Sequence, residues 1–181
     1  AGAVVFGKTN VPVALADFQS YNEIYGTTRN PWDTKRVPGG SSGGAAAAIA
    51  AGLTGLELGS DIGGSIRNPA HYCGVFGHKP TWGLLSPRGH DLGALRPIDI
   101  AVIGPIARSA SDLDLVVRAL AGPDELDAAG IDVRLQGLDK PTPALRIAVW
   151  ADDPRAPVSA EVAARVRAVA AALAEGGALV D

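Results

Sequence analysis

The chain has 181 residues, with 16 Lys and Arg against 19 Asp and Glu, so its formal net charge is −3. Hydrophobic residues make up 47% and charged residues 19%, a balance that predicts a folded domain with a buried core and excludes a disordered chain. The mildly acidic composition lacks the basic blocks typical of nucleic-acid or membrane-surface binding, and no apolar run reaches the length of about 18 residues expected of a membrane-spanning helix. The single cysteine, Cys73, excludes an internal disulfide and a cysteine-based zinc site.

Short apolar runs that end in small turn residues predict the elements of the first half. Residues 3–6 predict a buried strand, whereas residues 8–40 are polar and predict a loop with at most one short helix. The alanine-rich residues 43–52 predict a helix, because alanine has the highest helix propensity. Residues 56–59 predict a strand, and residues 60–69 predict a turn into a short helix or loop.

The next segment contains a strand, a capped helix and a long connection. Residues 98–106 predict a strand that Gly104-Pro105 splits. Ser109 or Ser111 can cap a helix that runs to residue 120 and ends before Gly122-Pro123. Residues 124–143 are charged and rich in turn residues, which predicts a surface connection.

The last segment predicts a second strand and helix. Residues 145–150 predict a strand, and Ser159 caps a helix with an apolar stripe at helical spacing. The stripe consists of Val162, Val166, Val169 and Leu173. Residues 178–181 predict the beginning of a further strand. Strands that alternate with helices favour an α/β domain, and the strand-like beginning and end indicate an internal fragment.

A first glycine-rich motif fits a nucleotide site only by its letters. Residues 2–9 match the phosphate-loop pattern G-x-x-x-x-G-K-[ST]. That loop requires middle residues that cradle phosphate and a helix after them. Here the middle residues are Ala, Val, Val and Phe, which are typical of a strand, and Pro12 stands where the helix would run. The pattern therefore indicates a strand and a turn.

A second motif fits the nucleophile elbow of α/β-hydrolases. Residues 40–44 match G-x-S-x-G with Ser42 at the centre. An elbow follows a buried strand, whereas the preceding residues are Lys-Arg-Val-Pro-Gly-Gly. Chain order leaves a Ser–His pair open, because all three histidines lie downstream, but the missing strand disfavours this interpretation.

Taken together, the two serine segments resemble a known signature. Residues 39–44 read Gly-Gly-Ser-Ser-Gly-Gly, and residues 59–67 read Gly-Ser-Asp-Ile-Gly-Gly-Ser-Ile-Arg. Their serines Ser41 and Ser65 stand 24 positions apart, and Gly-His-Lys-Pro-Thr follows at residues 77–81. This pattern is similar to the signature of the amidase signature family of serine hydrolases.

The resemblance implies a fold and an activity. In the family the fold is an α/β domain, a mixed β-sheet covered by helices on both faces. Residues 1–181 would be an internal fragment of one such domain, incomplete at both ends, with the signature core at residues 38–83. The activity would be hydrolysis of a linear carboxylic amide to the acid and ammonia or an amine, without cofactor or metal.

The resemblance also implies roles for individual residues. Ser65 would be the nucleophile that forms an acyl-enzyme, and Ser41, preceded by a cis peptide bond, would relay the proton. The consecutive N–H groups of residues 62–65 would form the oxyanion hole, because its two glycines leave the approach clear. We assign the oxyanion hole to Ile62, Gly63 and Gly64, and the supporting positions to Ser42, Ser60, Asp61 and Arg67. Arg67 is expected to pair with Asp61, and the glycines around Ser41 are expected to allow unusual backbone angles.

No lysine of the chain matches the family's catalytic base. Lys8, Lys35, Lys79 and Lys140 lie in segments that resemble other parts of the family pattern or in polar loops. We therefore expect the base before residue 1 and expect the isolated 181-residue chain to be inactive. Cys73 lies in an apolar stretch and is expected to be a buried small side chain, not a nucleophile.

The expected partner is a small-molecule amide, with no nucleic acid and no membrane, and a homo-oligomer is possible. The compartment is unknown, with the cytoplasm as the default. One alternative is the glutamine-hydrolysing subunit of an aminoacyl-tRNA amidotransferase, and another is a non-catalytic protein that retains the fold. Residues 99–105, Asp-Ile-Ala-Val-Ile-Gly-Pro, differ from the Ser-Leu-Asp-Gln-Ile-Gly-Pro typical of the amidotransferase and favour a general amidase.

Overall fold

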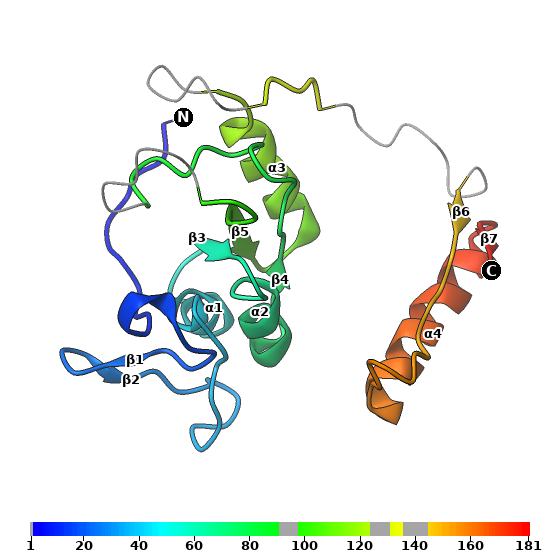
Figure 1. Cartoon of the computed structure of the whole chain (residues 1–181), viewed down its shortest axis with the longest axis horizontal. Coiled ribbons are helices and arrows are strands. Elements are labelled where there is room, and N and C mark those ends of the chain that lie inside the picture. Colours follow the sequence, from blue (N-terminus) through cyan, green and yellow to red (C-terminus); the bar gives the residue numbers. More distant parts are fainter. Residues whose placement is uncertain (1, 91–97, 124–130, 136–144) are drawn as a thin grey trace. The chain divides into compact units, whose positions relative to one another are not determined.

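The computed structural model describes residues 2–90, 98–123, 131–135 and 145–181. The chain forms two compact units, Ala1–Arg134 and Leu135–Asp181 (Figure 1). The described elements of the first unit are a 3₁₀ helix η1 (Val13–Leu15), strands β1 (Tyr21–Asn22), β2 (Gly26–Thr27), β3 (Leu56–Asp61), β4 (Phe76–Gly77) and β5 (Val102–Ala107), and helices α1 (Gly43–Ala50), α2 (Arg67–Cys73) and α3 (Ala110–Leu120). Those of the second unit are β6 (Arg146–Ile147), α4 (Ala160–Glu175) and β7 (Leu179–Val180).

A three-stranded antiparallel sheet with the order β3-β5-β4 organises the first unit. Strand β5 pairs with β3 along the whole register from Leu56↔Ala107 to Asp61↔Val102. Helix α1 contacts both β3 and β5, and α3 contacts β5; Figure 1 shows α1 and α3 on different sides of the strands. The mixed α/β fold class is thus confirmed, with antiparallel pairs in this unit and a parallel pair in the other.

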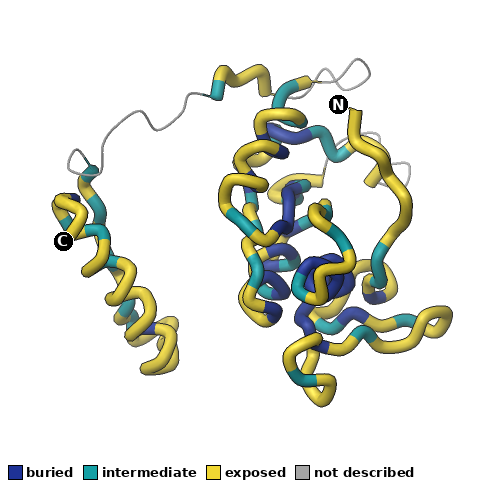
Figure 2. Tube along the Cα trace, turned by 180° about the vertical axis from the view of Figure 1, so that it is seen from behind, coloured by how far each residue is buried: buried dark blue, intermediate teal, exposed yellow. Residues whose placement is uncertain are grey.

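Helix α1 lies in the centre of this unit. Its glycines and alanines from residue 43 to 48 and Ile49 are all buried, which Figure 2 shows as a continuous dark coil. Ile49 packs in one cluster with Ile66, Cys73 and Ile106. A helix that is apolar on every side is stable only when it is enclosed, so the alanine-rich run forms a core helix. The first serine segment leads directly into this helix, and the second lies between β3 and α2.

Two strand predictions in this unit are wrong. Residues 3–6 form no strand, and their side chains are exposed, because no described strand pairs with their backbone. Strand β5 begins at Val102 instead of residue 98 and continues through Gly104-Pro105. The strand is not split because the Pro105 carbonyl accepts a hydrogen bond from the His78 N–H at 3.0 Å, and because Gly104 has no Cβ to obstruct the His78 carbonyl.

The predicted capped helices are confirmed. The Ser109 hydroxyl accepts a hydrogen bond from the Asp112 N–H at the start of α3, and the Ser159 hydroxyl accepts one from the Val162 N–H at the start of α4. The predicted strand at residues 145–150 shortens to β6, which pairs in parallel with β7, the expected strand of residues 178–181.

The valine stripe of α4 is largely uncovered in its own unit. Val169 is 61% exposed, whereas Ala163 of the same helix is buried. The stripe stays open because the sheet of this unit consists of two short strands. Most of the predicted connection at residues 124–143 lies outside the described residues. Among the described residues, no helix is long and apolar enough to cross a membrane.

Candidate functional site

The two serine segments meet in the folded chain. The Ser42 N–H donates to the Ser65 carbonyl at 3.1 Å, and the Ser42 hydroxyl accepts from the Ser60 N–H at 3.3 Å. A Cβ on Gly59 would lie 2.5 Å from the Ser42 hydroxyl oxygen, so a residue larger than glycine would separate the segments. Ser42 is 5% exposed, so the hydrogen bonds that connect the two serine segments are made by a buried residue.

The predicted serines differ in their access to solvent. Ser41 is 1% exposed and follows a cis peptide bond from Gly40, the bond that the family resemblance implies. Ser65 is partly exposed at the start of the turn into α2. Ser41 is therefore enclosed, whereas a ligand can approach Ser65 from solvent.

The fully buried Asp61 organises the second serine segment. Its Oδ1 accepts the Gly64 N–H at 2.8 Å, and its Oδ2 accepts the N–H groups of Ile66 and Arg67 at 3.0 and 3.2 Å. The predicted ion pair is present: Arg67 donates Nη2 to Oδ1 at 2.9 Å and Nε to Oδ2 at 3.1 Å. Burial by itself would raise the pKa of Asp61, but these hydrogen bonds outweigh it, so the pKa lies below its ordinary value. The same pair raises the pKa of Arg67.

This carboxylate also changes the set of N–H groups that can face a ligand. The Gly64 N–H, one of the three predicted oxyanion donors, points inward to Asp61. The N–H groups of Ile62, Gly63 and Ser65 have no acceptor within the described residues. Ile62 and Gly63 are exposed, and a Cβ built on Gly63 meets no atom within 4 Å. The described contacts thus leave the N–H groups of Ile62 and Gly63 without an acceptor, whereas the Gly64 N–H is bound by Asp61.

Two supporting residues were missed by the sequence analysis. Ser20, 0% exposed, accepts the Gly43 N–H at 2.9 Å and donates to the Ser41 carbonyl at 3.1 Å. The Asn68 side-chain oxygen accepts the Gly40 N–H at 3.3 Å. No motif of the sequence analysis includes Ser20, whereas Asn68 directly follows the second serine segment, residues 59–67, and could have been considered.

The remaining candidates do not join this arrangement. Lys8 and Lys35 are exposed, Lys79 is partly buried, and Lys140 lies outside the described residues. Cys73 is fully buried, and burial raises the pKa of its thiol to about 11, as expected for an inert side chain. Within the described part of the chain, no group of three or more His, Cys, Asp or Glu side chains could hold a metal ion.

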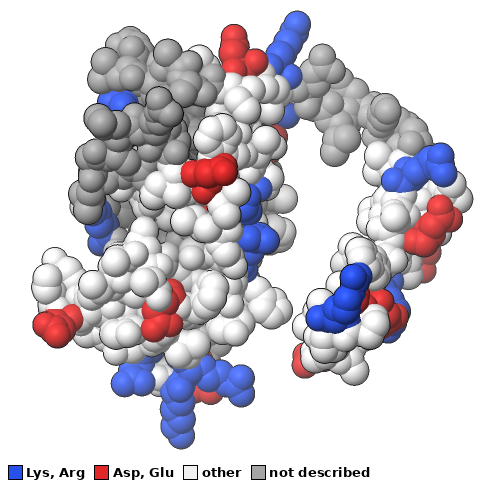
Figure 3. All heavy atoms as spheres, in the orientation of Figure 1, with Lys and Arg blue, Asp and Glu red and all other residues white. Residues whose placement is uncertain are grey.

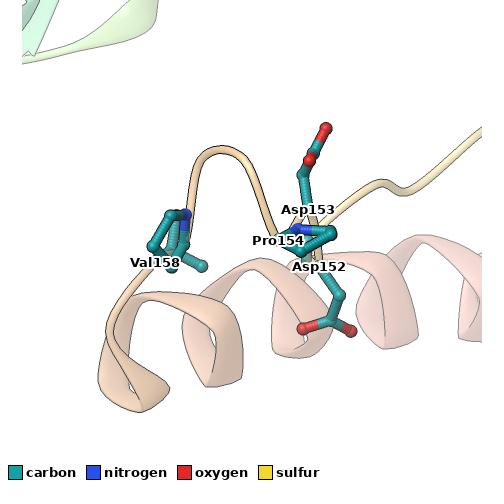
Figure 4. Close-up of a pocket in the computed structure, with 6 residues that line it drawn as sticks. Asp152, Asp153, Pro154 and Val158 are labelled. Atoms are coloured by element: carbon teal, nitrogen blue, oxygen red, sulfur yellow. The ribbon is translucent and has the colours of Figure 1, made fainter.

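A hollow in the second unit is a different feature. It has a volume of about 270 Å³ and is lined by Ala151, Asp152, Asp153, Pro154, Pro157 and Val158 (Figure 4). Its carboxylates are already paired, Asp152 with Arg167 at 2.6 Å and Asp153 with Arg155 at 3.2 Å. The hollow therefore offers neither a nucleophile nor an unpaired charge.

The visible surface of the first unit carries charges of both signs (Figure 3). Figure 3 shows its basic side chains at several places on this face, with one small group at the lower end of the unit.

Comparison with known proteins agrees with the signature. The family model named Amidase matches residues 1–181. One subunit of the glutamyl-tRNA(Gln) amidotransferase from Thermus thermophilus is 49% identical over 151 residues, which are 82% of this chain and 31% of that protein. The crystal structure of the corresponding subunit from Thermotoga maritima has a TM-score of 0.83 and 35% identity, over 98% of this chain and 39% of that one. A bacterial aryl acylamidase of the amidase signature family has a TM-score of 0.83 and 33% identity, over 97% and 36%. The chain thus spans about a third of the length of these proteins.

Proposed function

The chain belongs to the Amidase family, and we propose that it supplies the nucleophile and the oxyanion-binding loop of an enzyme that hydrolyses carboxylic amides through an acyl-Ser65 intermediate. One observation carries this proposal. The hydrogen bond from the Ser42 N–H to the Ser65 carbonyl joins the buried Ser41 segment to a partly exposed serine, and the N–H groups of the exposed Ile62 and Gly63 have no acceptor among the described residues.

The reaction begins with the addition of the Ser65 hydroxyl oxygen to the amide carbonyl carbon. The serine proton passes through the Ser41 hydroxyl to a general base, and the carbonyl oxygen becomes an oxyanion. The N–H groups of Ile62 and Gly63 donate to this oxyanion, and one such donor typically lowers the barrier by about 2.7–4 kcal/mol. The C–N bond then breaks, the nitrogen takes the proton, and ammonia or an amine leaves. Water cleaves the acyl-Ser65 ester in a second addition that releases the acid and restores the serine.

The general base is assigned to none of the described lysines. A lysine base must be neutral, which requires burial or a neighbouring positive charge to lower its pKa. Lys8 and Lys35 are exposed, and Lys79 lies in the Gly-His-Lys-Pro-Thr segment, to which the family resemblance gives a structural role.

The decisive experiment labels the nucleophile in the protein expressed from its complete gene. A fluorophosphonate probe should form one serine–phosphorus bond with loss of fluoride, and peptide mass spectrometry should place it on Ser65. Ser65→Ala should abolish the label, and Ser111→Ala, a change at an exposed serine of α3, should retain it. A protein that takes no label and releases no ammonia from amides would instead be a non-catalytic member of the family.

A second candidate is the glutamine-hydrolysing subunit of a tRNA amidotransferase. The 49% identity to the amidotransferase protein from Thermus thermophilus favours it, whereas the departure of residues 99–105 from the sequence typical of such proteins favours a general amidase. The two candidates are distinguished by comparing the rate of ammonia release from glutamine with the rate from simple amides such as propionamide and benzamide. Turnover confined to glutamine, together with copurifying subunits, would establish the second candidate.

A further inference from the structure

We propose that Ser20 is a positioning residue that fixes the main chain on both sides of Ser41 and thereby sets where the Ser41 hydroxyl lies relative to Ser65. This inference rests on the proposed function and deepens it. It concerns a residue outside both signature segments, since Ser20 lies 19 positions before residue 39.

The first support is the set of groups that the Ser20 hydroxyl contacts. It accepts the Gly43 N–H at 2.9 Å and donates to the Ser41 carbonyl at 3.1 Å, with the Gly39 carbonyl at 3.3 Å as a second acceptor. These main-chain groups lie before, at and after the proposed relay serine. A single hydroxyl therefore defines the path of the chain through Ser41.

The second support is burial. Ser20 is 0% exposed, and Gly39, Ser41 and Gly43 are buried as well, so water cannot replace the hydroxyl if it is removed. Three main-chain polar groups would then lack a partner, and the chain would shift to satisfy them. A shift of this segment would move the Ser41 side chain with it.

The third support is the close contact between residues 17–20 and residues 40–43. A Cβ on Gly43 would contact the Ser20 hydroxyl, and one on Gly40 would lie 2.6 Å from the Asp17 carbonyl oxygen. The main chain of residues 17–20 therefore lies directly against that of residues 40–43. Ser42 continues this contact to Ser65 through its 3.1 Å hydrogen bond, which links Ser20 to the nucleophile in two steps.

The test compares Ser20→Ala with Ser109→Ala in the protein expressed from its complete gene. Ser109→Ala is a matched control, because it also removes a hydroxyl that accepts a main-chain N–H, but at the start of α3. Hydrogen exchange is read on peptides covering residues 38–45, and kcat and KM are measured with an amide that the unmodified enzyme hydrolyses. Ser20→Cys, which keeps the shape but has a weak acceptor, replaces the alanine variant if that variant does not fold.

We expect exchange at the Gly43 amide to rise about tenfold in Ser20→Ala beyond the change in the control, the ratio that corresponds to one hydrogen bond of typical net strength. We also expect kcat to fall about 10- to 100-fold with KM little changed, because the defect lies in the position of a reacting group. Unchanged exchange at Gly43 overturns the positioning role, whatever the activity. Increased exchange with an unchanged kcat overturns the role in catalysis. If the fluorophosphonate probe does not label Ser65 of the unmodified protein and the protein hydrolyses no amide, the proposed function itself is wrong. The proposed catalytic role of Ser20 is then wrong as well.

Discussion

Replacing Asp61 by asparagine tests whether one buried carboxylate holds the nucleophile loop together. The carboxylate accepts three main-chain N–H groups, from Gly64, Ile66 and Arg67, and two donors of the Arg67 side chain. Asparagine has nearly the same shape, so the change leaves no cavity. It replaces one acceptor oxygen by an NH₂ group, which can only donate.

The size of the effect follows from the donors that lose their acceptor. If the amide nitrogen takes the place of Oδ2, the main-chain N–H groups of Ile66 and Arg67 lose their acceptor. If it takes the place of Oδ1, the Gly64 N–H loses its acceptor. A buried polar group without a partner costs about 1–3 kcal/mol. The side chain of Arg67 is 55% exposed and regains water, so loss of its ion pair adds at most about 1 kcal/mol. The amide adopts the less costly of the two placements, so we expect Asp61→Asn to lower the free energy of unfolding by about 1–4 kcal/mol.

The assay is urea unfolding followed by tryptophan fluorescence. Because the chain forms two compact units, a Trp150→Phe background removes the tryptophan of the second unit. The matched control is Asp114→Asn on α3, whose carboxylate is 61% exposed and pairs with Arg118 at 2.8 Å, because a surface ion pair contributes little to stability. If Asp61→Asn destabilised the first unit no more than this control, the reasoning from buried donors would be refuted.

The pH dependence gives an independent check. The pKa of Asp61 is lower in the folded chain than the ordinary value of 3.8, so its ionised form stabilises the folded state. This contribution is fully present above pH 3.8 and is lost as the pH falls through the lower folded-state value. The difference in stability between the unmodified protein and Asp61→Asn should therefore shrink in acid, and a difference that stayed constant would contradict the assignment.

Three further predictions follow from local geometry. Gly59→Ala places a Cβ 2.5 Å from the Ser42 hydroxyl oxygen and should destabilise the first unit by about 1–3 kcal/mol, whereas Gly55→Ala meets no atom within 4 Å and should change stability by less than about 0.5 kcal/mol; equal urea midpoints would contradict this. Iodoacetamide at pH 8 should alkylate Cys73 about 100-fold more slowly in the folded chain than in guanidinium, because burial raises the thiol pKa from 9.0 to about 11; similar rates would show that the thiol is accessible. Ser109→Ala removes the hydroxyl that accepts the Asp112 N–H in the first turn of α3 and should lower the free energy of unfolding by about 1 kcal/mol, while Ser109→Asp, which keeps an acceptor, should stay close to the unmodified value.

The features that the sequence predicts correctly are those with a local physical cause. Helices α3 and α4 begin where Ser109 and Ser159 can accept an N–H three residues later, and α1 forms where alanine dominates. The pairing of Asp61 with Arg67 is also local, because the two residues are six positions apart in one turn.

The features that the sequence misses depend on a partner elsewhere in the chain. A strand exists only if another strand satisfies its backbone, so an apolar pattern at residues 3–6 is not sufficient. The sequence also gives no indication of the partner of the Gly64 N–H. It predicts that this group is an oxyanion donor, whereas in the structure the group donates to the Asp61 carboxylate. Residue type indicates which groups are available, and only the fold determines which way they point.

The glycines around Ser41 show that a motif can be predicted correctly while the physical reason for its residues is not. Their predicted role is backbone freedom, yet of the four only Gly39 has a positive φ, at 83°. The other three lack space for a side chain: a Cβ on Gly40 would lie 2.6 Å from Asp17, and on Gly43 or Gly44 it would contact Ser20 or Asn10. Glycine is thus required here chiefly because residues 10–20 lie against the motif. It follows that residues 10–20, which lie outside both serine segments, help to define the path of the main chain at Ser41.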